Sequence, residues 1–123
     1  MSKDLALPGP EMPVIDENRL LDEFGGDQEI LDELKALFLE HVPPLYEGIQ
    51  NAVAQADAEV LASNVHSLKG ACATYGAPRL AEVCKQIEML ARTGDLDAVQ
   101  ANMDVLAEEY GKVFETIQAT VDA

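Results

Sequence analysis

Residues 57–94 read DAEVLASNVHSLKGACATYGAPRLAEVCKQIEMLARTG, a pattern typical of two amphipathic helices joined by a tight turn. Asp57 is a good N-cap, and the apolar residues after it recur at alternating steps of four and three. These residues are Leu61, Val65, Leu68, Cys72 and Tyr75. Gly76 then suits a helix end, Pro78 suits the first turn of the next helix, and Gly94 suits that helix's end. The stretch predicts two antiparallel neighbouring helices.

Helical periodicity continues on both sides of this pair. Upstream, apolar residues at spacings of three and four predict one long helix from Asp27 to Ala56. Pro43 and Pro44 lack a backbone N–H, so we expect either a kink or a break there. Downstream, Asp95 can cap a last helix with an uninterrupted apolar line. That line consists of Val99, Met103, Leu106, Tyr110, Val113 and Ile117.

A shorter helix precedes these four. Asp16 can cap it, and the Gly25-Gly26 pair should end it. Three prolines within residues 7–13 predict a flexible leader over residues 1–14, which leaves residues 15–123 for the folded domain. The expected fold class is all-α, an antiparallel up-down-up-down four-helix bundle with a short additional N-terminal helix.

Composition excludes several classes of function. The chain has 123 residues, of which 48% are hydrophobic, enough for the core of one domain. Eight basic and 23 acidic residues give a net charge of −15, which would repel nucleic acids and anionic lipids. No segment offers a long uncharged apolar run, so we expect a cytoplasmic protein. We also expect a monomer, although no residue pattern decides the oligomeric state. Cys72 and Cys84 form no C-x-x-C pair and are expected to pack as small apolar residues.

A second stripe on the first of the two helices is unusual for a solvated surface. It lies one step round from the apolar line and consists of Ala62, His66, Lys69, Gly70 and Ala73. Exposed stripes carry mostly charged and polar residues, whereas this one surrounds a single imidazole with small residues. Gly70 costs roughly 1 kcal/mol of helix propensity relative to Ala, which suggests that close access to His66 matters.

Basic residues gather near this stripe. Half of them fall within 24 positions, namely Lys69, Arg79, Lys85 and Arg92. Residues 60–94 contain only two acids, Glu82 and Glu88, so four cations against two acids give this segment a net charge of +2. Such a patch would stabilise a phosphoryl group on the histidine and attract an acidic partner surface.

The run His66-Ser67-Leu68-Lys69-Gly70, followed by Gly76-Ala77-Pro78, Leu80, Cys84 and Glu88, resembles the signature of histidine phosphotransfer (HPt) domains. The number and order of the expected helices are also similar to that family, whose histidine is exposed midway along one helix of the bundle. Ala71-Cys72 departs from the pattern, because relatives often have small hydroxyl residues after the glycine. This departure would weaken hydrogen bonding around a phosphoryl group without preventing the chemistry.

The resemblance implies a phosphorelay mechanism. His66 would accept a phosphoryl group from an aspartyl phosphate on a receiver domain and pass it to another receiver domain. The ammonium group of Lys69 would offset the negative charge on the phosphoryl oxygens. The implied partners are response-regulator receiver domains and a hybrid or upstream histidine kinase. The chain would need no cofactor or metal of its own, because the receiver domain supplies Mg²⁺.

The small stripe residues and the local cations are candidates for access and docking around His66. Small side chains would give the receiver clearance, and nearby cations would help to dock it. These residues are Gly70, Ala62, Ala73, Arg79 and Lys85. Glu88 fits the family pattern, and a structural role, capping or pairing on the bundle surface, stays open as the alternative. The initiator Met and the leader favour a free-standing shuttle over a fragment of a larger kinase.

Other functions are less compatible with the sequence. A kinase would need a nucleotide site, and no G-x-x-x-x-G-K-[ST] loop occurs, so we expect a phosphoryl carrier and no enzyme. A di-iron bundle needs Glu-x-x-His on two helices, but Ser63 and Phe38 stand three residues before His66 and His41. An adaptor that binds a receiver domain through the same face without phosphorylation stays open as an alternative. His41 has no neighbouring Lys-Gly and is expected to be structural.

Overall fold

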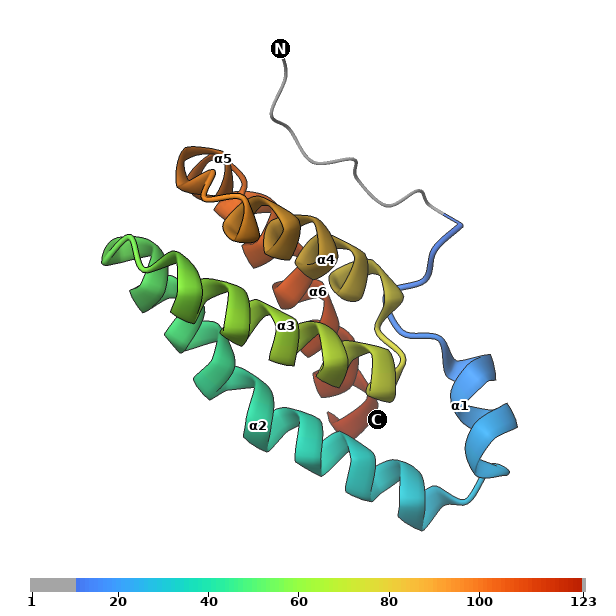
Figure 1. The fold of residues 1–123 in the computed structure, drawn as a ribbon. Coiled ribbons are helices and arrows are strands. Elements are labelled where there is room, and N and C mark those ends of the chain that lie inside the picture. The colour runs from blue at the N-terminus through green and yellow to red at the C-terminus, as the bar shows by residue number, and fades with distance from the viewer. Residues whose placement is uncertain (1–10, 123) are drawn as a thin grey trace.

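The computed structural model describes residues 11–122, with side chains described up to residue 118. This part of the chain is entirely helical apart from turns and loops, which confirms the expected all-α class (Figure 1). The helices are α1 (Glu17–Phe24), α2 (Gln28–Ala54), α3 (Ala58–Tyr75), α4 (Pro78–Arg92), α5 (Leu96–Ala101) and α6 (Met103–Asp122). Residues 1–10 lie outside the described residues, so the division into leader and domain stays a prediction.

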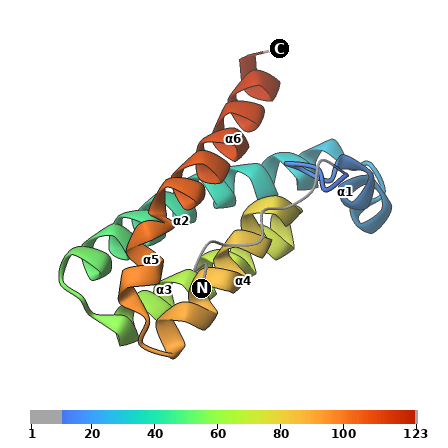
Figure 2. The ribbon, with the colours of Figure 1, turned by 90° about the horizontal axis from the view of Figure 1, so that it is seen from above.

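Four long helices form the bundle. Figure 1 shows α2, α3 and α4 side by side, with α3 in the middle, and α6 behind them. Aromatic pairs join α2 to α6: the rings of Tyr46 and Tyr110 are stacked with centroids 4.0 Å apart, and those of Phe38 and Phe114 are tilted at 5.9 Å. The short helices α1 and α5 lie at opposite ends of the bundle (Figure 2). This arrangement leaves one face of α3 uncovered.

Local capping signals fix most of the helix boundaries. The carboxylates of four aspartates accept backbone N–H groups at the start of a helix, as the sequence predicts. These are Asp16, Asp27, Asp57 and Asp95. Gly25 and Gly76 end α1 and α3 with φ of 64° and 91°, a left-handed conformation that residues with a Cβ rarely adopt. The predicted turn between α3 and α4 is therefore confirmed.

The double proline does not break the second helix. Both Pro43 and Pro44 lie inside α2, which is continuous for 27 residues. Each proline removes a backbone donor, but tertiary contacts hold the helix on both sides of the pair. Val42 is fully buried before the prolines, and the Tyr46 ring stacks on Tyr110 after them. Burial of this face outweighs the lost hydrogen bonds.

The last helix is split, which corrects the expectation of one uninterrupted helix after Asp95. Asn102 separates α5 from α6, and its side-chain amide donates to the Ala98 carbonyl at 2.7 Å. Asn competes with the helical backbone in this way, and here it closes α5 while its own carbonyl accepts from the first turn of α6. The apolar period survives the split, because Val99 and Leu106 are both fully buried.

The predicted apolar lines meet in one core. All five residues of the α3 line are buried, and they pack with buried apolar residues of α4. The fully or nearly fully buried residues of these two helices are Leu61, Val65, Leu68, Cys72, Tyr75, Leu80, Val83, Cys84 and Ile87. Leu90 is only partly buried against this core. Both cysteines are free and buried, in agreement with their expected packing role.

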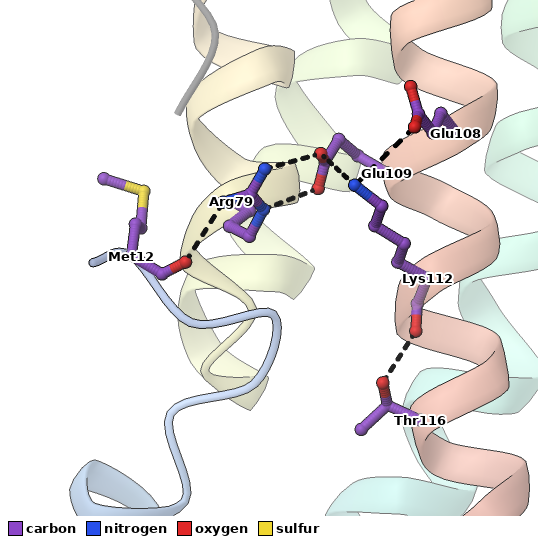
Figure 3. Close-up of polar contacts among 6 residues, drawn as sticks. All are labelled: Met12, Arg79, Glu108, Glu109, Lys112 and Thr116. Atoms are coloured by element: carbon purple, nitrogen blue, oxygen red, sulfur yellow. Dashed lines mark hydrogen bonds and ion pairs between the residues drawn. The ribbon is translucent and has the colours of Figure 1, made fainter. Parts of the chain in front are cut away.

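A buried ion pair joins α4 to α6. The Arg79 guanidinium donates two hydrogen bonds to the Glu109 carboxylate, Nε to Oε2 and Nη2 to Oε1, both at 3.0 Å (Figure 3). Lys112 Nζ lies 3.3 Å from the same carboxylate. Arg79 also donates to the Met12 carbonyl at 3.3 Å, which holds the chain before α1 against α4. Only 14% and 5% of the Arg79 and Glu109 side chains are exposed, so this pair belongs to the structural framework.

The N-terminal helix is tied to the turn between α3 and α4. The Asp16 N–H donates to the Gly76 carbonyl at 2.7 Å, and Arg19 donates to the Ala73 carbonyl. These two bonds place α1 beside the end of α3, well down the helix from its middle (Figure 1). The middle of α3 is left accessible.

Candidate functional site

His66 lies midway along α3 with its side chain 60% exposed. Its Nδ1 atom is 3.0 Å from Oε2 of Glu88 on the neighbouring helix α4. The ring is thus held at one nitrogen and open to solvent elsewhere. A surface histidine without such a partner would have no fixed ring orientation.

Glu88 is the centre of the site. Its side chain is only 8% exposed, yet three side chains with nitrogen donors reach it. Besides His66, Arg92 Nη2 and Nε lie 2.6 and 2.8 Å from Oε2. Lys69 Nζ lies 2.7 Å from Oε1 in an ion pair that lacks hydrogen-bond geometry. One buried carboxylate therefore connects His66 to two cations.

The charge state of Glu88 follows from these contacts. Burial alone would raise the pKa of its carboxyl, but Lys69, Arg92 and His66 outweigh burial and lower the pKa to about 2. Glu88 is thus ionised at any physiological pH and can only accept hydrogen bonds. We assign the proton of a neutral His66 ring to Nδ1 on this ground, which leaves the lone pair on Nε2.

Lys69 and Gly70 follow His66 on the same face of α3. Lys69 is partly exposed and lies against Glu88, so its ammonium group is close to the site but already paired. Gly70 is exposed, and a Cβ added to it would meet no atom within 4 Å. Gly70 borders a groove of about 390 Å³ between α2 and α3, to which Leu37, Phe38 and His41 contribute from α2. The helix surface beyond Gly70 is therefore open.

Two of the expected access and docking residues lie elsewhere than the sequence suggests. Ala62 is buried in the core and offers almost no surface beside His66, while Ala73 is exposed. Arg79 faces α6, where Glu109 binds its guanidinium (Figure 3). This burial argues against a docking role for Arg79. Lys85 is exposed and shares a cavity with Lys69, so it stays a candidate docking residue.

Sequence reasoning misses that Glu88 and Arg92 belong to the site. The sequence suggests a structural role for Glu88 on the surface, whereas the structure buries it beneath His66. A signal is present, because in an antiparallel pair of helices residues equidistant from the turn lie opposite each other. His66 and Glu88 each stand 11 positions from Ala77. Arg92 follows Glu88 by four residues, the spacing of side-chain pairs on a helix.

The part of the chain that the structure describes offers neither a metal centre nor a membrane span. Within it, no group of three or more His, Cys, Asp or Glu side chains is arranged to hold a metal ion. No described helix combines the length and apolar character that a bilayer span requires.

Comparison with known proteins decides the family. The model of the Hpt domain family matches residues 33–116, which include His66, Lys69, Glu88 and Arg92. The chain belongs to the Hpt domain family. The resemblance inferred from the signature is thus confirmed, and membership supports histidine phosphotransfer in a phosphorelay. Proteins of this family are phosphoryl carriers, which is consistent with the expected absence of kinase activity.

Solved structures agree with this family. Histidine-containing phosphotransfer protein B (HptB) from Pseudomonas aeruginosa PAO1 superposes with a TM-score of 0.80 and 25% identity, over 88% of this Hpt chain and 94% of that chain. A histidine-containing phosphotransfer protein from maize gives a TM-score of 0.76 at 23% identity, over 89% of this chain and 83% of that one. The maize protein supports the fold alone.

Among curated proteins, this Hpt chain is similar to the signal transduction histidine-protein kinase BarA. The identity is 24% with the Shigella flexneri protein and 23% with that of Escherichia coli K12, over 92% of this chain in both cases. The chain spans about 14% of the length of these kinases. The similarity therefore concerns one segment of a much larger protein.

The charge state of Glu88 predicts how stability depends on pH. A carboxyl whose pKa is about 2 when folded, against roughly 4.3 when unfolded, stabilises the fold above pH 4.3. This stabilisation is lost as pH falls through 2. We expect Glu88→Gln to lower the free energy of unfolding at pH 7 by on the order of 2 kcal/mol, and the deficit to shrink toward pH 2.

Urea unfolding followed by circular dichroism at several pH values measures this effect. Glu115→Gln is the matched control, because Glu115 is exposed on α6. It should change stability little at any pH. A Glu88→Gln deficit of constant size from pH 7 to pH 2.5 would contradict the assigned charge state.

Proposed function

We propose that this protein carries phosphoryl groups from one receiver domain to another, with Nε2 of His66 as the acceptor atom. The observation that carries the proposal is the contact between the exposed imidazole and the buried, ionised Glu88. Nδ1 is engaged by the carboxylate, which leaves the lone pair on Nε2 of a largely exposed ring. Family membership supports the same role for this histidine.

The transfer step needs no reacting group from any other site on this chain. The Nε2 lone pair attacks the phosphorus of a receiver's aspartyl phosphate, and an N–P bond forms. The P–O bond to the aspartate breaks, and its electron pair returns to the receiver's carboxylate. The ring keeps its proton on Nδ1. The negative charge of Glu88 stabilises the positive charge that develops on the ring. Transfer to a second receiver is the same step in reverse.

The receiver domain supplies the rest of the chemistry in this proposal. Its Mg²⁺ neutralises the charge on the transferring phosphoryl group, and its aspartate is both donor and acceptor. The partners would be receiver domains and a hybrid or upstream histidine kinase, in keeping with the similarity to a segment of BarA. A cytoplasmic location and a monomeric state stay predictions.

Lys69 and Gly70 would prepare the surface for the receiver. Lys69 lies within reach of Glu88, one helical turn from His66, and adds positive charge where phosphoryl oxygens would gather. Gly70 and the apolar groove beside it allow the receiver's backbone to approach the ring. An added side chain at Gly70 would occupy this approach.

Gly70→Gln separates docking from folding. The free energy of unfolding of the variant should exceed that of the wild type by about 0.5–1 kcal/mol, because Gly is a poor helix former and no atom lies within 4 Å of an added Cβ. Transfer from a phosphorylated receiver should slow by about tenfold or more, because misplacement of reacting groups is costly. Chemical denaturation and a timed transfer assay measure the two effects.

Gly111→Gln on α6 is the matched control. A Cβ added at Gly111 would also meet no atom within 4 Å, and this glycine likewise lies in the middle of a helix. The variant should gain stability and transfer at the wild-type rate. Equal transfer rates for both variants would show that Gly70 is not part of the docking surface.

A relay with two receivers tests the proposed function. One receiver carries labelled aspartyl phosphate, and the second starts without label. Label should reach the second receiver only when this protein is present. Binding of both receivers without any passage of label would favour the alternative, an adaptor that acts without phosphorylation.

A further inference from the structure

Arg92 and His66 bind the same oxygen of Glu88. His66 Nδ1 lies 3.0 Å from Oε2, and Arg92 Nη2 and Nε lie 2.6 and 2.8 Å from it. The guanidinium therefore takes two of the contacts to Oε2 and the imidazole one. Lys69 occupies the other carboxylate oxygen, Oε1. The Arg92 side chain is 57% exposed.

Glu88, Lys69 and Arg92 together carry a net positive charge. Glu88 contributes one negative charge, while Lys69 and Arg92 contribute one positive charge each. A second proton on His66 would enter at Nε2, because Nδ1 already carries one. That proton would remove the nucleophilic lone pair. The negative charge of Glu88 alone would favour binding of this second proton, whereas the positive charges of Lys69 and Arg92 disfavour it.

We propose that Arg92 is a positioning residue that acts through Glu88 to keep the Nε2 lone pair of His66 available, an inference that rests on the proposed phosphoryl transfer. It does so by compensating the negative charge on Glu88 Oε2 while leaving the Nδ1 hydrogen bond in place. Arg92 need not touch the receiver or the phosphoryl group for this role.

Other titratable groups on the helices around the ring are less directly placed. They are Glu59 on α3, Lys85 on α4 and His41 on α2. In the described part of the chain, none of these three makes a hydrogen bond or ion pair with the imidazole. A simpler role for Arg92 would be to stabilise the last turn of α4, where a cation interacts favourably with the helix dipole. That role predicts an effect on stability alone.

The test measures protonation of the His66 ring without any receiver. NMR signals of the ring carbons and nitrogens are followed from about pH 5 to 9 in wild type, Arg92→Gln and Arg92→Lys. Removing one cation from the group should raise the midpoint of the His66 titration by about 0.5–1 pH unit. Arg92→Lys keeps a cation near Oε2 and should restore the wild-type midpoint. Lys35→Gln on α2 removes a charge far from the site and should leave it unchanged.

The same variants then give distinct pH profiles for phosphoryl acceptance. Arg92→Gln should accept about three- to tenfold more slowly than wild type at pH 6, as the expected midpoint shift requires, and should accept at least as fast as wild type above pH 8.5. A uniform loss at every pH, or an unchanged His66 titration, would overturn the proposal and leave Arg92 as a helix-stabilising residue. If wild type itself accepts no phosphate, the proposed function fails, while the NMR titration still decides the role of Arg92.

Discussion

Exchange of His66 for Gln is expected to abolish phosphoryl acceptance and leave the fold intact. Gln keeps a polar side chain at a position that is 60% exposed, so packing is unchanged. Its amide has no nucleophilic nitrogen, because the nitrogen lone pair is delocalised into the carbonyl. Label transferred from a phosphorylated receiver should fall to background, while helicity and unfolding stay close to the wild type.

His41→Gln is the control for this exchange. His41 is exposed on α2 and contributes to the groove beside Gly70, but it has no carboxylate partner in the described structure. The variant should accept phosphate close to the wild-type level. Retention of label by His66→Gln, or its loss in His41→Gln, would refute the assignment of the acceptor.

Arg79→Ala is expected to cause the largest loss of stability. Among the described residues, it would leave the Glu109 carboxylate, 5% exposed, with Lys112 as its one remaining partner (Figure 3). The hydrogen bonds from Arg79 hold the pKa of Glu109 below its usual value against the effect of burial. Removing one partner of a buried ion pair costs about 3 kcal/mol or more, because the other charge stays buried. Urea unfolding at pH 7 measures this loss.

A double variant separates the ion pair from other roles of Arg79. Replacing both partners, Arg79→Ala with Glu109→Leu, should recover much of the lost stability, since no buried charge is left unpaired. Transfer per folded molecule should be unchanged in either variant. A stable Arg79→Ala protein that binds receivers poorly would instead support the docking role that the sequence suggests.

Local signals account for what the sequence predicts well. The α3–α4 pair needs only a cap at Asp57, a left-handed glycine at Gly76 and a regular apolar line, all of which act within a few residues. The exposed histidine follows from the composition of the neighbouring stripe. Continuity of α2 across Pro43 cannot be read from the sequence, because contacts with α6 outweigh the local preference of proline.

Pairings between distant residues account for what the sequence does not predict. Arg79 looks like a surface cation because its partner, Glu109, is 30 positions away on a helix whose orientation around the bundle the sequence does not reveal. Asn102 lies within an apolar period that continues past it, so the split between α5 and α6 leaves no gap in the pattern. Glu88 can be paired with His66 from their equal distance to the turn.

The most direct measurement is to map the phosphorylated atom. The protein is incubated with a receiver domain that carries labelled aspartyl phosphate, and the modified residue is identified by mass spectrometry and phosphorus NMR. The account predicts an acid-labile, alkali-stable phosphoramidate on Nε2 of His66. Label on Nδ1 or on another residue, or no label despite measurable binding of the receiver, would contradict it.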